Sequence, residues 1–135
     1  MTVFVDTSAV VALVSSADRH HTEAVALWTE LLAQRARLIT TDLVIAETVV
    51  VLRVRGGFDL SVRAGDRLLA DPFEVEWVKR ELMDDAWRLY RKYRDHTLSL
   101  CDCVSFATMR RLDIETAFAF DDDFTAVGFS RMRST

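Results

Sequence analysis

The sequence has few of the residues that mark specialised protein classes: it contains two cysteines, one proline and four glycines in 135 residues. Cys101 and Cys103 lie too close together to staple distant parts of a fold, so we expect free thiols. They also lack the second pair of ligands that a structural zinc site needs. None of the glycines stands in a phosphate-binding loop pattern, which argues against a nucleotide-binding enzyme of that type.

Long apolar segments are missing as well. The run 9–14 has six residues and the stretch 43–52 is broken by Glu47, whereas a membrane-spanning helix needs about 20 apolar residues. The N-terminus carries Asp6 instead of the basic start of a signal peptide. We therefore expect a cytoplasmic protein that does not associate with membranes.

The balance of charge and hydropathy indicates a folded domain. Hydrophobic residues make up 50% and charged residues 28%, and the formal net charge is only −4. Disordered chains combine low hydrophobicity with a large net charge, and non-specific nucleic-acid binders are basic over a whole face. We expect one domain over residues 1–135, with a core that needs neither disulfides nor a structural metal.

Apolar patterning alternates between strands and helices along the whole chain. The expected strands are 3–5, 38–40, 73–78, 116–120 and 127–132, and the expected helices are 9–14, 18–34, 43–55, 60–70, 80–96 and 99–112. Thr7 and Ser8 are expected to form the N-cap of the first helix. Thr41 or Asp42 is expected to be the N-cap of the third helix. This alternation predicts an α/β fold, a three-layer α/β/α sandwich with a mostly parallel central sheet.

Several acidic residues follow the expected strands, where ligands of parallel sheets bind. Asp6 ends the first strand and Asp121 the fourth. Glu47 lies on the apolar stripe of a helix, and Asp102 follows Ser99 by three residues at a helix start. Taken singly, Asp6 suits a turn, Asp102 a capping box and the run 121–123 a solvated turn. Only Glu47 lacks such a structural explanation.

Taken together, these four acids are expected to converge at one edge of the sheet. Two like charges about 4 Å apart repel by about 4 kcal/mol at an effective dielectric constant of about 20. A cluster of carboxylates therefore requires protons or a cation. Ligation by oxygen alone favours Mg²⁺ or Mn²⁺ over Zn²⁺.

Four segments carry a family resemblance. They are VFVDTSAVVALV at 3–14, TTDLVIAETVVVLR at 40–53, LSLCDCVSFATMRRL at 98–112 and AFAFDDDF at 117–124. In this order they resemble the motifs of PIN-domain ribonucleases and, more narrowly, the toxins of VapBC-type toxin–antitoxin pairs. The resemblance covers nearly the whole chain.

The resemblance implies a metal-dependent endoribonuclease that leaves a 5′-phosphate and a 3′-hydroxyl. Asp6, Glu47, Asp102 and Asp121 would be its catalytic residues and its ligands for Mg²⁺ or Mn²⁺, with Ser8 supporting the first acid and Asp123 as an additional candidate ligand. It also implies three partners: an RNA substrate, a cognate antitoxin protein and a second copy of the chain in a homodimer.

One departure from the family pattern keeps an alternative open. Family members often place a threonine two residues before the late aspartate, where this chain has Ala119. A catalytically degenerate module that binds RNA or protein is therefore the alternative interpretation. Phosphoryl transfer through an aspartyl phosphate is less favoured, because that chemistry usually needs an acid at the position of Ser8 or a well-placed lysine.

Basic and aromatic residues also lie outside the motifs. The stretch Arg88, Arg91, Lys92 and Arg94 could steer an RNA strand toward the acids, but a solvated helix face is the favoured interpretation. The three tryptophans, Trp28, Trp77 and Trp87, are expected in the core or in an interface. The apolar run 49–52 with Val54 predicts a surface that a partner covers.

Overall fold

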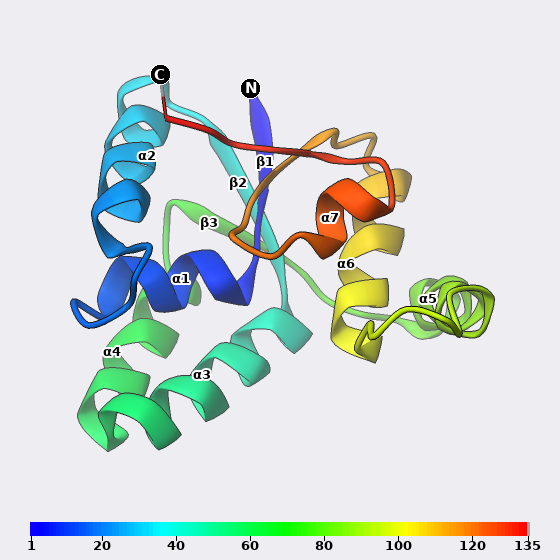
Figure 1. Cartoon of the computed structure of the whole chain (residues 1–135), viewed down its shortest axis with the longest axis horizontal. Helices are drawn as coiled ribbons and strands as arrows, with labels where there is room; N and C mark the ends of the chain where they lie inside the picture. Colours follow the sequence, from blue (N-terminus) through cyan, green and yellow to red (C-terminus); the bar gives the residue numbers. More distant parts are fainter. Residues whose placement is uncertain (135) are drawn as a thin grey trace.

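Five short parallel strands form the centre of the computed structural model, which describes residues 1–134 (Figure 1). The strands are β1 (Thr2–Val5), β2 (Arg37–Thr41), β3 (Phe73–Glu76), β4 (Thr116–Phe118) and β5 (Ser130–Arg131). The helices are α1 (Thr7–Val14), α2 (His21–Ala33), α3 (Asp42–Gly56), α4 (Phe58–Leu68), α5 (Arg80–Lys92), α6 (Leu100–Arg111) and α7 (Asp123–Ala126). The expected α/β class is confirmed.

The sheet has the strand order β3-β2-β1-β4-β5, and every neighbouring pair is parallel. Val3 is paired with Leu38 on one side and with Thr116 on the other. The chain therefore starts in the middle, builds outward to β3 and returns to place β4 beside β1. Ligands bind at such a reversal of strand order, because the connections leaving the two central strands diverge there.

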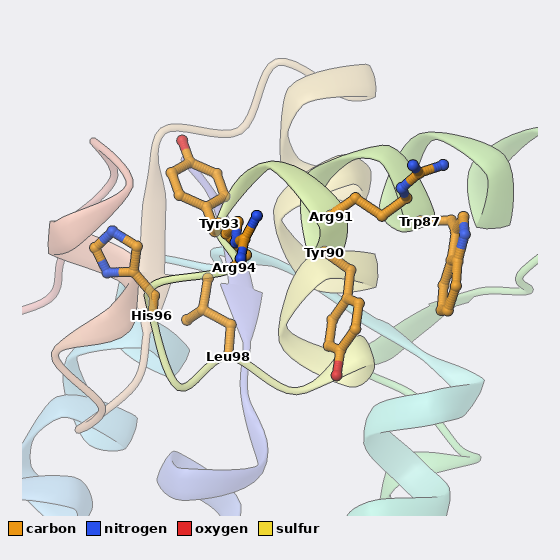
Figure 2. Close-up of a pocket in the computed structure, with 7 residues that line it drawn as sticks. All are labelled: Trp87, Tyr90, Arg91, Tyr93, Arg94, His96 and Leu98. Atoms are coloured by element: carbon orange, nitrogen blue, oxygen red, sulfur yellow. The ribbon is translucent and has the colours of Figure 1, made fainter.

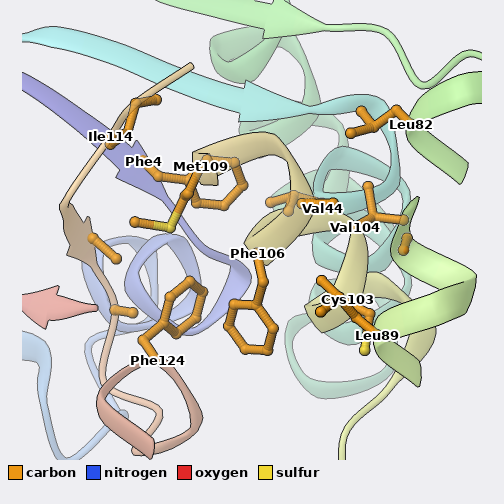
Figure 3. Packing of buried hydrophobic residues seen from close by; sticks show 14 of the residues in the cluster. Phe4, Val44, Leu82, Leu89, Cys103, Val104, Phe106, Met109, Ile114 and Phe124 are labelled. Atoms are coloured by element: carbon orange, nitrogen blue, oxygen red, sulfur yellow. The ribbon is translucent and has the colours of Figure 1, made fainter. Parts of the chain in front are cut away.

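Both faces of the sheet are covered by helices, which gives the predicted three layers. Val3 and Val5 pack with residues of α1, α2 and α4, whereas Phe4 faces the opposite side and packs with residues of α5, α6 and α7 (Figure 3). Successive side chains of a strand point to opposite faces, so a strand buried on both faces is apolar throughout. The run of Val3, Phe4 and Val5 is such a strand.

The ends of the helices follow local capping chemistry. Thr41 caps α3, accepting a hydrogen bond from the backbone N–H of Val44 at 3.2 Å, as the sequence predicted. The first helix differs: its cap is Asp6, and Ser8 lies inside the helix. The prediction that Thr7 and Ser8 form that cap was wrong, because the carboxylate already occupies the capping position and accepts from the N–H of Ser8.

The C-terminal third differs most from the expected boundaries. The expected strand 116–120 ends at Phe118, and only Ser130–Arg131 of the expected 127–132 strand is paired. The one-turn helix α7 was not predicted. It is built by local hydrogen bonds, such as that from the Ala126 N–H to the Asp122 carbonyl, and is too short to show an apolar period.

Some large apolar side chains remain outside the core. Trp28 is half-buried against the cluster of α1, α2 and α4, but Trp77 and Trp87 are 57% and 50% exposed, so a core position is wrong for these two. Val50 and Val54 on α3 are also exposed. Within residues 1–134, no helix combines the length and hydropathy needed to cross a bilayer.

Replacing Gly57 with alanine is expected to destabilise the fold. Gly57 joins α3 to α4 with φ +95° and ψ 175°, a backbone conformation that is adopted essentially by glycine alone and costs another residue roughly 1–3 kcal/mol. Chemical denaturation should show a loss of about that size. Gly65→Ala is the matched control, because Gly65 lies in α4 and an added Cβ would meet Val49 at an ordinary 3.4 Å. Equal stability of both variants would contradict the prediction.

Candidate metal-binding active site

Asp6 lies at the carboxyl end of β1 and is only 4% exposed. Its Oδ2 accepts two hydrogen bonds from Ser8, one from the backbone N–H at 3.1 Å and one from Oγ–H at 2.6 Å. Its own backbone N–H donates to the carbonyl of Phe118 at the end of β4. The two central strands and the start of α1 therefore fix this carboxylate.

Ser8 links the two strand ends on either side of the site. Its hydroxyl donates to Asp6 and also accepts from the backbone N–H of Phe120 at 3.0 Å. Phe120 directly precedes Asp121. One hydroxyl thus connects the acid after β1 to the chain segment that carries the next acid.

Helix α3 is held over α1 by buried hydroxyl groups. The Thr48 hydroxyl donates to Thr7 Oγ1 at 3.2 Å, and the Thr7 hydroxyl donates to the carbonyl of Val44 at 3.4 Å. Glu47, next to Thr48, is half-buried and is hydrogen-bonded to the thiol of Cys101 on α6. Hydrogen bonds on either side therefore position Glu47 between α1 and α6.

Asp102 serves the start of α6 with one of its oxygens. Oδ2 accepts from the backbone N–H of Ser99 at 3.0 Å, and the Ser99 hydroxyl accepts from the backbone N–H of Asp102 at 3.0 Å, which forms a capping box. Oδ1 remains for a ligand. Burial raises the pKa of Asp102 above its usual value, and the like charges of Asp121 and Glu47 add to this shift.

Asp121 and Asp123 complete a close group with Asp102. The Asp121 carboxylate accepts from the backbone N–H of Asp123 at 2.8 Å. One carboxylate oxygen from each of the three residues lies within 4.8 Å of the other two. Burial raises the pKa of Asp123 to about 7, helped by its hydrogen bond to Asp121 and by the charges of Asp121, Asp102 and Asp6.

The charges at this site are not compensated by the protein. Burial raises the pKa of Asp6 to about 7; the Ser8 hydrogen bonds oppose this shift, whereas Asp102 and Asp121 add to it. Within residues 1–134, no lysine or arginine forms an ion pair with Asp6, Asp102, Asp121 or Asp123. The site therefore needs protons or a cation. Its oxygen ligands suit a hard divalent ion.

The thiol beside the acids does not change this preference. Burial raises the pKa of Cys101 far above its usual value, and the Glu47 carboxylate raises it further. Only a thiolate is an effective zinc ligand. The close group of Asp102, Asp121 and Asp123 offers only oxygen atoms, which favour a hard divalent ion.

The structure brings three of the six predicted site residues into one close group and places the other three near it. Asp102, Asp121 and the additional candidate Asp123 form the close trio. Asp6 lies outside this trio, but its carboxylate interacts electrostatically with those of Asp102 and Asp121. Glu47 interacts in the same way with Asp102, and the Ser8 hydroxyl donates a hydrogen bond to Asp6.

The contacts of Cys101, Thr7 and Thr48 were not anticipated. Their signal was weak, because small polar residues next to acids on helices usually face solvent. Ala119 is buried and brings no hydroxyl; the link between the strand ends comes from Ser8 instead.

Comparisons with known proteins agree with this arrangement. The PIN domain family model matches residues 3–130. The 23S rRNA-specific endonuclease VapC20 of Mycobacterium tuberculosis, from strains CDC 1551 and H37Rv, is 35% identical over 131 residues, which cover 97% of this chain and 98% of that protein. The crystal structure of M. tuberculosis VapC20, described as a sarcin–ricin loop cleaving toxin, has a TM-score of 0.89 and 34% identity, and the match covers 98% of this chain and 99% of that one. The predicted family resemblance is confirmed.

Without metal, the stability of the protein should fall as the pH rises. The pKa of Asp6 is about 7 in the fold against 3.8 for a free carboxyl, so the folded state binds more protons between these values and loses stability as they leave. This difference corresponds to at most about 4 kcal/mol. Thermal unfolding in EDTA from pH 4 to pH 8 measures it.

Asp6→Asn is the control for this pH dependence, because the amide cannot titrate. Its unfolding temperature should depend less on pH than that of the wild type. Mg²⁺ added at pH 8 should recover stability in the wild type. A wild-type profile as flat as that of Asp6→Asn would contradict the assignment.

Ser8→Ala should destabilise the protein and disturb Asp6. The variant leaves the backbone N–H of Phe120 without its acceptor and removes one donor to the Asp6 carboxylate, at a cost of roughly 1–3 kcal/mol. It should also move the steep part of the pH profile to higher pH, since the Ser8 hydrogen bonds lower the pKa of Asp6. Ser16→Ala, at an exposed position, is the control. An effect no larger than that of Ser16→Ala would count against the bridging role.

Proposed function

This chain belongs to the PIN-domain family, and we propose that it is a metal-dependent endoribonuclease that hydrolyses RNA phosphodiester bonds. The observation that carries the proposal is the trio of Asp102, Asp121 and Asp123 beside the buried Asp6, with which no lysine or arginine of residues 1–134 forms an ion pair. Carboxylates gathered without compensation are typical of sites that bind divalent metals for phosphodiester hydrolysis.

The substrate class is inferred from relatives. VapC20 of M. tuberculosis is named a 23S rRNA-specific endonuclease, and it matches this chain over nearly its full length. The VapC20 structure matches 98% of this chain with a TM-score of 0.89, so the two proteins share their fold. On that basis we propose RNA cleavage for this chain.

The metal that fits best is Mg²⁺ or Mn²⁺. Asp6, Glu47, Asp102 and Asp121 would hold it, with Asp123 as an additional ligand, because all five offer oxygen atoms at one end of the sheet. When bound, such an ion lowers the pKa of a coordinated water and stabilises the charge that develops on the phosphate.

The residues of the chain position the carboxylates of the site. Ser8 keeps the Asp6 carboxylate in one orientation, and the capping box does the same for Asp102 through its Oδ2 alone. The Asp121 carboxylate accepts a hydrogen bond from the backbone N–H of Asp123, which holds these two acids beside each other. Attack by water, without the ribose 2′-hydroxyl, leaves a 5′-phosphate and a 3′-hydroxyl.

We also propose the biological setting of the relatives for this chain. It would act in the cytoplasm as the toxin of a toxin–antitoxin pair, inhibited by a cognate antitoxin protein and assembled as a homodimer. The exposed apolar side chains of Val50 and Val54 on α3 support an additional protein partner.

Cleavage of RNA by the purified protein tests the proposal. We expect 23S rRNA to be cut in Mg²⁺ or Mn²⁺, with EDTA abolishing the reaction. Asp6→Asn and Asp102→Asn should each lower the rate at least 100-fold, because each removes a charged ligand. Asp59→Asn, at an exposed position of α4, should leave it unchanged. Ligation of an adaptor that requires a 5′-phosphate identifies the product ends.

The outcomes separate the alternatives. Cleavage that survives both EDTA and Asp102→Asn would contradict a metal site at these acids. RNA binding without cleavage would favour a degenerate binding module. Growth arrest on induction of the wild type but not of Asp6→Asn would support the toxin role.

A further inference from the structure

A second concave surface lies on α5 and on the loop that leads from α5 to α6. This hollow has a volume of about 640 Å³, and its walls come from the second half of the helix and the following residues (Figure 2). The side chains that line it are Trp87, Tyr90, Arg91, Tyr93, Arg94 and His96. The hollow therefore combines aromatic rings with cations and includes no acid.

The aromatic side chains are presented to solvent. Trp87 and Tyr90 are 50% and 42% exposed, and their rings stack with centroids 5.4 Å apart and an interplanar angle of 16°. Tyr93 is half-buried and meets the His96 ring edge-on at 5.5 Å. A pair of parallel exposed rings is a preformed platform on which another flat ring can stack.

The arginines of α5 divide into paired and unpaired groups. Arg80 forms an ion pair with Asp84, and Arg88 with Asp85. Neither Arg91 nor Arg94 forms an ion pair with any acid of residues 1–134. These two guanidinium groups, which belong to the hollow, are therefore free to bind an anion.

The hollow adjoins the acidic site along the chain. Leu98 also lines the hollow, and Ser99, the next residue, is the N-cap that holds Asp102. The hollow and the acid Asp102 are therefore linked by a short stretch of chain at the start of α6.

We propose that this hollow binds unpaired nucleotides of the RNA substrate, with bases stacked on Trp87 and Tyr90 and phosphates held by Arg91 and Arg94. The inference rests on the proposed function and extends it from cleavage to substrate binding. Aromatic rings that stack on bases beside arginines that hold phosphates are the recurrent chemistry of single-strand recognition. Arginine also binds phosphate in a bidentate manner.

A second copy of the chain fits the hollow less well. A two-fold interface centred on the hollow would bring Arg91 and Arg94 of both copies close together, and the residues that line the hollow include no acid to offset their charge. An RNA strand supplies the opposite charge and flat rings at once.

The first test measures binding of a fluorescein-labelled single-stranded RNA by anisotropy, in an Asp102→Asn background that prevents cleavage. Trp87→Ala should weaken binding about ten-fold, the effect of losing one stacking ring. For the same RNA annealed into a duplex, Trp87→Ala should change the affinity little, because paired bases are not free to stack on the protein. Trp77→Ala is the matched control, since Trp77 is equally exposed but lies outside the hollow.

The second test measures the salt dependence of the same binding. Each phosphate contact to a single strand contributes about 0.7 to the slope of log affinity against log salt concentration. Arg91→Ala combined with Arg94→Ala should therefore reduce the slope by about 1.4. The pair Arg55→Ala and Arg63→Ala, on α3 and α4, removes the same charge elsewhere and should change the slope little.

Kinetics and sedimentation separate this proposal from its premise. In the cleaving enzyme, Trp87→Ala should raise KM and leave kcat nearly unchanged. If the wild type binds RNA in a way that depends on Trp87 but does not cleave it, the proposed nuclease function is wrong and the proposal that the hollow binds RNA still holds. Unchanged RNA affinity and KM in Trp87→Ala would contradict the proposal that the hollow binds RNA. If Trp87→Ala instead loses a dimer in sedimentation while its RNA affinity is unaltered, the proposal is also wrong, and this face belongs to an interface with a second copy.

Discussion

The repulsion among carboxylates gathered beside β1 and β4 is the constraint on which the rest of the site depends. The reversal of strand order brings these acids together, and hydrogen bonds from Ser8 and Ser99 keep Asp6 and Asp102 from turning away. Burial strengthens the repulsion, because less water screens it. The protein therefore carries a region that its own packing cannot neutralise. A metal ion that relieves this repulsion also stabilises the fold, so binding and stability are linked.

Asp102 shows that a structural and a functional role can share one side chain. Its Oδ2 completes a capping box worth about 1 kcal/mol, while its carboxylate also lies in the close group with Asp121 and Asp123. The capping box fixes the direction of the carboxylate and so serves the site directly. From the sequence alone, helix capping and metal binding looked like alternatives for Asp102. The spacing from Ser99 to Asp102 already explains an acid at this position as part of a capping box, so no ligand is needed to explain it.

The sequence predicted the features that follow from the spacing of apolar residues. It did not predict features that short local hydrogen bonds or contacts between distant residues determine. The apolar run of β1 and the helix around Glu47 were recognisable from spacing alone, as were the class of fold and the edge of the sheet where acids would meet. The one-turn α7 was not, because a few local hydrogen bonds build it. The thiol contact of Glu47 was equally hidden, since Cys101 is more than fifty residues away. The relation of Asp121 to Asp123 depends on a turn that brings both carboxylates to Asp102.

Helix α5 illustrates the same limit for charge. A stretch with four cations is most simply interpreted as a solvated face, and the paired Arg88 fits that description. Arg91 differs in forming no ion pair with an acid of the described residues 1–134, which depends on where the helix points its side chains. This difference also bears on how RNA could approach. The acidic site repels phosphates until a cation is bound, whereas unpaired arginines at the end of α5 attract them at any time. An RNA strand could therefore bind to α5 before the metal ion neutralises the acids. The unpaired arginines would thus allow RNA to bind either before or after the metal.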